Sequence, residues 1–348
     1  MPDIASLGLA ILIPVFLGAA LVVWFAGARL ANLASEIADR TGLNQAIIGV
    51  ILLGGATSLP EISTSGVATL AGNPGMAVNN LLGGVAFQVV VLAIADLFVG
   101  RGALTTMIPG PRVMSNAVIS ILLLALASIG ATSGDISLPF VQMGAFPILI
   151  AICYVGSLWL LGGKSAASGW SPVEPIKDVQ EEKRHDEISF TSLFIRSALA
   201  AVAILVAGTI LTLSAEAIAG DLGIDLGIAG LTFLAVATSL PEISTAITAA
   251  RLKRAEMVIG DVLGGNMFDI MLLVFVDGLY TGGIALQQAD RSSIVMALTA
   301  IFLTGLLLLG LIERRDRAAM RMGYDMIAIL VTYISATTAI VMGVFAET

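Results

Sequence analysis

The stretch of sequence that decides the fold occurs twice in this chain. Residues 56–64 read ATSLPEIST, and residues 237–245 read ATSLPEIST again, at an offset of 181 residues. The register continues without a gap, and identical residues recur at the same offset: Met76 and Met257, Leu82-Gly83-Gly84 and Leu263-Gly264-Gly265, Phe87 and Phe268, Asp96 and Asp277. Nine identical residues in a row indicate an internal duplication rather than similar composition.

The composition is that of a protein embedded in a lipid bilayer. Of 348 residues, 57% are hydrophobic and only 12% are charged, with a mean hydropathy of +0.99. Soluble domains carry about twice this share of charged residues. We therefore predict a multi-pass membrane protein, and we exclude a cytosolic enzyme, a secreted disulfide scaffold and a nucleic-acid binder.

The positions of the single cysteine and the single histidine limit the kinds of site that the protein can contain. Cys153 lies in an apolar run, so no disulfide framework exists, and His185 lies in the only long polar stretch. Histidine-based metal or acid–base chemistry inside the membrane is thereby excluded. The sequence also shows no nucleotide-binding loop and no nucleophile motif, so we predict neither enzymatic activity nor a resident cofactor.

Apolar runs bounded by charged or turn residues predict ten membrane-spanning helices. They cover residues 6–28, 43–70, 76–99, 113–131, 139–162, 192–214, 224–250, 256–279, 292–312 and 323–345. The polar stretch 163–190 is interpreted as a linker between a first half, residues 1–162, and a second half, residues 191–348. With this map, one side of the membrane carries every loop Lys and Arg except Arg291. Because basic residues mark cytoplasmic loops, we expect a cell inner membrane protein with a cytoplasmic linker and both termini outside.

Five predicted helices separate the two copies of the repeat, and five is odd, so the copies cross the membrane in opposite directions. Inverted repeats are typical of secondary transporters, whose substrate site lies near the membrane midplane. The predicted fold is an all-α integral membrane protein with ten transmembrane helices in two inverted five-helix repeats.

Two glutamates, Glu61 and Glu242, fall in the middle of predicted spans. A carboxylate at that depth is costly and is read first as functional. The alternative, a structural carboxylate paired with Lys or Arg, is disfavoured because the four repeat helices hold no basic residue in their spans.

Oxygen donors surround each glutamate in the sequence. Pro60 and Pro241 lack an N–H and so free the carbonyls four residues earlier, while two hydroxyls lie on the glutamate's helix face. The donors are Ala56, Thr57, Ser58, Ala237, Thr238 and Ser239. An all-oxygen set suits a hard cation such as Ca²⁺ or Na⁺.

The following helix of each repeat completes the predicted site. Gln88 and Asp269 occupy equivalent positions, and Asn266 lies three residues before Asp269. The glycine pairs predict close approach of helix backbones. Asp96 and Asp277, two turns further on, are expected either to line an access path to the site or to lie at the membrane interface. Three buried carboxylates repel one another, so cations or protons must neutralise them, and that competition is a physical basis for exchange.

These residues resemble the cation/Ca²⁺ exchanger superfamily, whose repeats carry G-T-S-x-P-E followed by G-N-x-x-G-S-N-x-F-[ND]; the chain looks like a divergent prokaryotic-type member. The resemblance implies that Glu61 and Glu242 are the principal cation ligands. It further implies that Asp269, Gln88 and the hydroxyls of the two T-S pairs complete the coordination. Glycine replaces the family serine at Gly84 and Gly265, and Asp261 adds an acid. The lost hydroxyls favour H⁺ slightly over Na⁺ as the coupling ion.

The sequence thus predicts a secondary active antiporter that exchanges Ca²⁺ for Na⁺ or H⁺ by alternating access. The alternatives are a cation channel, an exchanger for another divalent cation, and an intramembrane hydrolase that would use Asp261 or Asp269 with Glu242. The expected partners are the transported ions and the lipid bilayer, without nucleic acid. The oligomeric state is not predicted.

Overall fold

A computed structural model describes most of the chain and shows a mostly helical protein. It describes residues 8–99, 103–108, 111–138, 141, 143–162, 189–223, 235–314, 318–319 and 322–344. Residues 163–188, which are most of the predicted linker, and residues 224–234 lie outside the described ranges.

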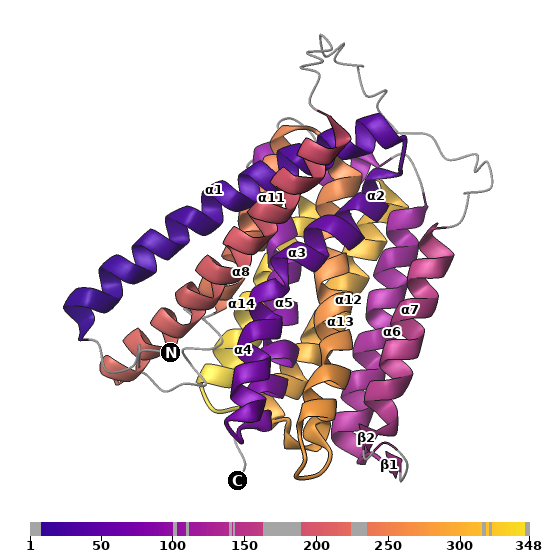
Figure 1. Ribbon diagram of the computed structural model, residues 1–348. Coiled ribbons are helices and arrows are strands. Elements are labelled where there is room, and N and C mark those ends of the chain that lie inside the picture. Colours follow the sequence, from indigo (N-terminus) through magenta and orange to yellow (C-terminus); the bar gives the residue numbers. More distant parts are fainter. Residues whose placement is uncertain are drawn as a thin grey trace.

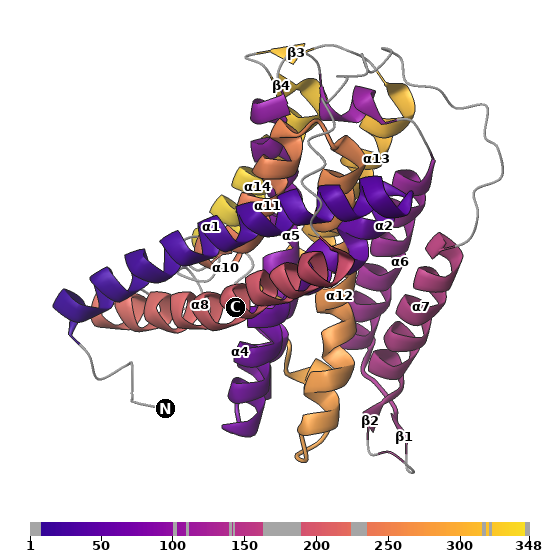
Figure 2. The same cartoon turned by 45° about the horizontal axis from the view of Figure 1, so that its top comes forward.

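Two long helices lie side by side and obliquely across the rest of the bundle (Figures 1 and 2). They are α1 (Leu9–Thr41) and α8 (Phe190–Asp221), of 33 and 32 residues. At 1.5 Å per residue each is about 50 Å long, well over the roughly 30 Å of a hydrocarbon core, so each must tilt in a bilayer or extend beyond its hydrocarbon core.

Each long helix packs against the glutamate-bearing helix of the opposite half. On α1, the Trp24 carbonyl accepts a hydrogen bond of 2.5 Å from the Ser244 hydroxyl on α11 (Leu240–Arg251). On α8, Gly208 lies against the ring of Pro60 on α4 (Leu59–Leu70), where a Cβ would overlap the proline. The two halves are therefore interleaved rather than stacked as separate units.

The segments carrying the repeat are broken helices. In the first half, α2 (Gln45–Ile48), a π-helix η2 (Gly49–Gly54), and α3 (Gly55–Thr57) precede α4, and the two parts meet at an angle of 42°. In the second half, α10 (Ala235–Thr238) precedes α11. The breaks fall at Ser58 and Ser239, two residues before Pro60 and Pro241, whose missing N–H prevents a continuous helix.

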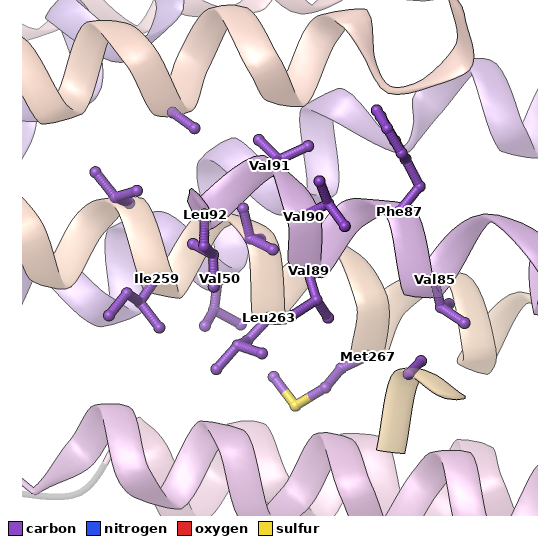
Figure 3. Close-up of a cluster of buried hydrophobic side chains, with 14 of the residues drawn as sticks. Val50, Val85, Phe87, Val89, Val90, Val91, Leu92, Ile259, Leu263 and Met267 are labelled. Carbon is purple, nitrogen blue, oxygen red and sulfur yellow. The ribbon is translucent and has the colours of Figure 1, made fainter. Parts of the chain in front are cut away.

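The most buried long helices are α5 (Pro74–Val99) and α12 (Ala255–Leu279), at the centre of the bundle. Around them pack α6 (Arg112–Ser133), α13 (Arg291–Glu313), α7 (Ala145–Gly162) and α14 (Tyr324–Val341). Figure 3 shows part of the core, in which Val50 of η2 joins Val89 and Leu92 of α5 and Leu263 of α12.

Glycines allow η2 and α12 to cross at backbone contact. A Cβ on Gly54 would lie 2.6 Å from the Gly265 nitrogen, and a Cβ on Gly264 would overlap the Cα of Val50. The expected close approach is therefore confirmed for the second glycine pair. Gly83 and Gly84 show no such contact among the described residues, and the segment equivalent to η2 would be 230–235, which is largely undescribed.

The expectation of a purely helical protein missed two short β-hairpins. Strand β1 (Ser137–Leu138) pairs antiparallel with β2 (Met143–Gly144), with Ser137 opposite Gly144. Strand β3 (Ala318–Ala319) pairs antiparallel with β4 (Met322–Gly323). Figure 2 shows the two hairpins at opposite ends of the bundle.

Asp96 and Asp277 fasten these hairpins to the central helices, and neither carboxylate is accessible to solvent. Asp96 on α5 accepts backbone N–H bonds from Leu104 at 2.6 Å and Gly323 at 2.8 Å. Asp277 on α12 accepts from Ala285 at 2.6 Å and Gly144 at 2.6 Å. The first donor of each pair begins a 3₁₀ turn, η3 (Leu104–Met107) or η5 (Ala285–Gln288).

Each aspartate thus joins its own half to the hairpin of the other, and we call these two arrangements the clasps. All four bonds involve buried backbone donors, so neither aspartate is placed at an exposed interface. The clasps give these two acids a structural role that their sequence positions did not reveal.

The number of membrane spans stays below the expected ten when counted by length and composition. Among the described residues, seven helices qualify, or eight if the bent pair Gln45–Thr57 and Leu59–Leu70 is one span. The apolar helix Ala145–Leu161 in α7 is too short to be counted as a membrane span. The span that would contain α10 begins in residues outside the described ranges. The full inverted arrangement therefore remains a prediction.

Candidate functional site

Glu61 and Glu242 occupy the same position on α4 and α11, in the first turn after each helix break. Glu61 is 6% exposed and Glu242 is 0% exposed. The two carboxyl groups, which come from opposite halves of the chain, lie close enough to interact electrostatically. One oxygen of Glu61 and both oxygens of Glu242 have no hydrogen-bond partner, and neither acid pairs with Lys or Arg in the described part of the chain.

Asp269 and Gln88 link the two central helices at the level of these glutamates. Gln88 Nε2 donates to Asp269 Oδ2 at 2.6 Å, between two side chains that are almost completely buried. Asp269 interacts electrostatically with both Glu61 and Glu242, and Ser58 lies beside it. The structure therefore brings together four predicted residues from four helices.

The predicted threonine ligands adopt matching geometry in the two halves. Thr57 Oγ1 donates to the Gly54 carbonyl at 3.3 Å, and Thr238 Oγ1 donates to the Ala235 carbonyl at 3.3 Å. Because each hydroxyl proton is directed at the backbone, the oxygen lone pairs remain available to a cation.

The remaining predicted donors are buried beside the helix breaks or on α12. Ala56, Ala237 and Ser239 are buried. Asn266 is 0% exposed, and neither its amide oxygen nor its amide nitrogen has a hydrogen-bond partner.

The carboxylates are near one another but are not drawn together as a tight ligand group. No set of three or more Asp, Glu, His or Cys side chains within the described ranges is close enough to hold a metal ion as it stands.

Gly265 stands where the related family carries a serine, and its surroundings show whether a side chain would fit. A Cβ on Gly265 would lie 3.6 Å from Gln88 Oε1 and 3.8 Å from Ser58 Oγ, both ordinary contact distances. Gly265 therefore lines the candidate site, and a small side chain would fit there.

Sequence reasoning missed a tyrosine beside the site. Tyr154 on α7 lies close enough to Asp269 to interact with it electrostatically, and its ring packs edge-on against Phe268, with ring centroids 6.1 Å apart. In the other half, Tyr333 packs in the same way on Phe87, the neighbour of Gln88, at 5.7 Å. The available signal was a tyrosine in the middle of an otherwise apolar run in each half.

The fold is that of a multi-pass membrane protein whose interior holds a buried group of carboxylates. The family model described as sodium/calcium exchanger protein matches residues 11–163 and 192–342. The chain belongs to the sodium/calcium exchanger family.

Individual relatives are distant but cover most of the chain. The protein named "Putative antiporter CaxA" from Alkalimonas amylolytica is 25% identical over 308 residues, 87% of this chain and 92% of that protein. Inner membrane protein YrbG from Escherichia coli K12 is 26% identical over 263 residues, 76% of this chain and 78% of that protein.

Solved structures of the sodium-calcium exchanger NCX_Mj share the fold. The form soaked with zero Na⁺ and Ca²⁺ superposes with a TM-score of 0.70 at 21% identity, covering 95% of this chain and 99% of that one. The form soaked with 2.5 mM Na⁺ and 1 mM Sr²⁺ gives 0.67 at 20% identity, with the same coverage.

Proposed function

We propose that this protein is a secondary active antiporter that exchanges Ca²⁺ for Na⁺ or H⁺ across a cell inner membrane. The observation that carries the proposal is the pair Glu61 and Glu242, two buried glutamates from duplicated motifs that interact electrostatically and have no basic partner among the described residues. Membership of the sodium/calcium exchanger family supports the same conclusion.

The proposed cation site is built from both halves. Glu61, Glu242 and Asp269 supply the charge, while Gln88 and Asn266 supply amide oxygens. Hydroxyl and carbonyl oxygens come from the broken helices, from Thr57, Ser58, Thr238, Ser239, Ala56 and Ala237. Binding of a divalent cation would draw the carboxylates together, and monovalent ions or protons arriving in its place would release it. This competition requires neither ATP nor covalent chemistry.

The proposed architecture is ten spans in two inverted repeats, with the site at the membrane midplane and the segment 163–190 in the cytoplasm. The paired breaks at Ser58 and Ser239 and the equivalent positions of α1 with α8, and of α5 with α12, support this arrangement. In such a duplicated structure, an alternating-access mechanism follows more naturally than a continuous pore.

Reconstitution in liposomes tests the proposal. Uptake of radioactive calcium is measured under an outward Na⁺ gradient at equal pH, and then under an outward H⁺ gradient without Na⁺. We expect uptake above the ionophore-collapsed baseline in at least one condition, together with counterflow of the driving ion. Calcium flux that follows only its own gradient would identify a channel instead, and uptake of another divalent cation but not Ca²⁺ would change the substrate.

Glu61→Gln and Glu242→Gln provide the matched site variants. Each removes one buried charge but keeps the side-chain shape, so the protein should elute as a monodisperse species while calcium uptake falls to the baseline of empty liposomes. Wild-type exchange by either variant would remove that glutamate from the site.

A further inference from the structure

One fully buried acid lies outside the cluster that the sequence predicted as the site. Asp261 is on α12, about two turns before Asp269, and is 0% exposed. One of its carboxylate oxygens, Oδ2, is hydrogen-bonded to Thr245 Oγ1, while the other, Oδ1, has no hydrogen-bond partner. A buried carboxylate oxygen without a partner is costly, which points to a ligand that completes it in the working state.

The free oxygens near Asp261 belong to one region between α11 and α12. The carboxylates of Asp261 and Glu242 repel each other, and both oxygens of Glu242 are also without partners. Thr245 lies one turn after Glu242 on α11, with its Oγ1 3.0 Å from the main-chain carbonyl oxygen of Glu242, and the same hydroxyl is hydrogen-bonded to the Asp261 carboxylate. Neither acid pairs with Lys or Arg among the described residues.

The first repeat shows the same arrangement without the extra acid. Thr64 is the equivalent of Thr245, and its Oγ1 lies 3.0 Å from the Pro60 carbonyl and 3.4 Å from the Glu61 carbonyl. The equivalent of Asp261 is the neutral Asn80, which is only partly buried. A negative charge has therefore been added on the Glu242 side alone.

The added charge changes what the buried region must bind. With Asp261, the carboxylates in and beside the candidate site number four instead of three, so one Ca²⁺ would neutralise only half of their charge when all are ionised. Leaving two negative charges uncompensated in a low-dielectric interior is strongly unfavourable. A further cation or protons must therefore neutralise the charge beside Glu242.

We propose that Asp261, Thr245 and Glu242 form a second cation-binding position, next to the central site, that takes Na⁺. Its donors are carboxylate and hydroxyl oxygens, which suit a hard monovalent cation. This position supplies oxygen ligands beside the central site. Gly84 and Gly265 lack the hydroxyls that the serines of the related family provide there. The proposal rests on the proposed function and names the place of its coupling ion.

The test compares Asp261→Asn with the wild type in liposomes at constant pH. Asparagine reproduces the residue of the first repeat and keeps an oxygen acceptor for Thr245. We expect the Na⁺ concentration that gives half-maximal calcium uptake to rise about tenfold, as for the loss of one ligand contact, and the Na⁺ Hill coefficient to fall. Calcium binding in Na⁺-free buffer should be retained.

Thr245→Val and Thr64→Val form a matched pair that removes only a hydroxyl. We expect Thr245→Val to reproduce the weaker Na⁺ dependence and Thr64→Val to match the wild type, so the result does not depend on the folding of Asp261→Asn. Unchanged Na⁺ dependence in Thr245→Val would overturn the second position while leaving exchange intact. Wild-type uptake driven by H⁺ but insensitive to Na⁺ would overturn Na⁺ as its ion, whereas absence of any coupled calcium flux would instead refute the proposed function.

Discussion

At the scale of single residues, the two repeats carry different side chains at one equivalent position of the candidate site. Gln88 and Asp269 are equivalent by position but are an amide and an acid, and they hydrogen-bond to each other at 2.6 Å. An amide can donate to a carboxylate, whereas a second carboxylate could not without holding a proton. The departure from symmetry therefore lets the central helices join without adding another charge.

Replacing that donor tests its role. In Gln88→Asp, two acids would face each other and share a proton at moderate pH. Calcium must then displace this proton, so we expect the apparent Ca²⁺ affinity to fall more steeply than in the wild type as pH is lowered. Uptake measured against Ca²⁺ concentration at several pH values shows the effect. Gln88→Asn keeps a neutral amide and should retain the wild-type pH profile; an identical profile for the aspartate variant would place Gln88 outside the site.

A second prediction at this scale concerns the missing hydroxyl. Gly265→Ser would place its side chain within ordinary contact of Gln88 and Ser58. We expect a folded protein that responds to lower Na⁺ concentrations, since an oxygen donor is added beside Asp269, and Gly84→Ser in the same chain should add to the effect. Gly264→Ser is the steric control, because its Cβ would overlap Val50, and it should reduce the yield of folded protein. A Gly265→Ser protein with unaltered Na⁺ dependence would contradict the assignment.

At the scale of helices and turns, the clasps explain how the buried ends of α5 and α12 are held. Each aspartate accepts two backbone N–H bonds from segments that would otherwise leave buried donors unpaired. Asp96 and Asp277 each lie two turns after a central site residue, Gln88 or Asp269. The clasps therefore fix the ends of the two helices whose side chains meet in the site.

Asn at either position should weaken a clasp. The amide has one acceptor oxygen, so one of the two N–H groups is left facing an NH₂ group. We expect Asp96→Asn and Asp277→Asn each to destabilise the protein by about 1–3 kcal/mol, seen as a lower thermal unfolding midpoint in detergent. Asp39→Asn breaks the more exposed contact with Arg254 and should cost about 1 kcal/mol or less. Equal midpoints for the three variants would argue against the clasps.

At the scale of the whole molecule, the predicted orientation follows from the segregation of basic residues. In a background without the single cysteine, Cys153→Ser, we expect a membrane-impermeant thiol reagent to label Thr348→Cys in intact bacterial spheroplasts. His185→Cys should react only after the membrane is made permeable. The reverse pattern would show that the protein has the opposite orientation. Labelling of both positions in sealed spheroplasts would refute the predicted odd number of spans between the linker and residue 348.

Much of the helical layout was accessible from the sequence because a bilayer imposes long apolar runs and the duplication marks equivalent helices. The proximity of Glu61, Glu242, Asp269 and Gln88 followed from the same duplication. The clasps could not be predicted, because an aspartate that accepts backbone bonds from another half looks the same in sequence as one that lines a path. The hairpins are too short to carry an alternating pattern, and the bond between Thr245 and Asp261 depends on how α11 meets α12.

The clasps also constrain the order in which the two halves can assemble. Asp96 is made early, but one of its two partners, the N–H of Gly323, emerges from the ribosome near the end of translation. The first half must therefore wait in the membrane with one end unfinished until the last hairpin arrives. Two halves translated from separate messages contain all the donors and acceptors between them, and together they should assemble into a working protein where neither half alone does.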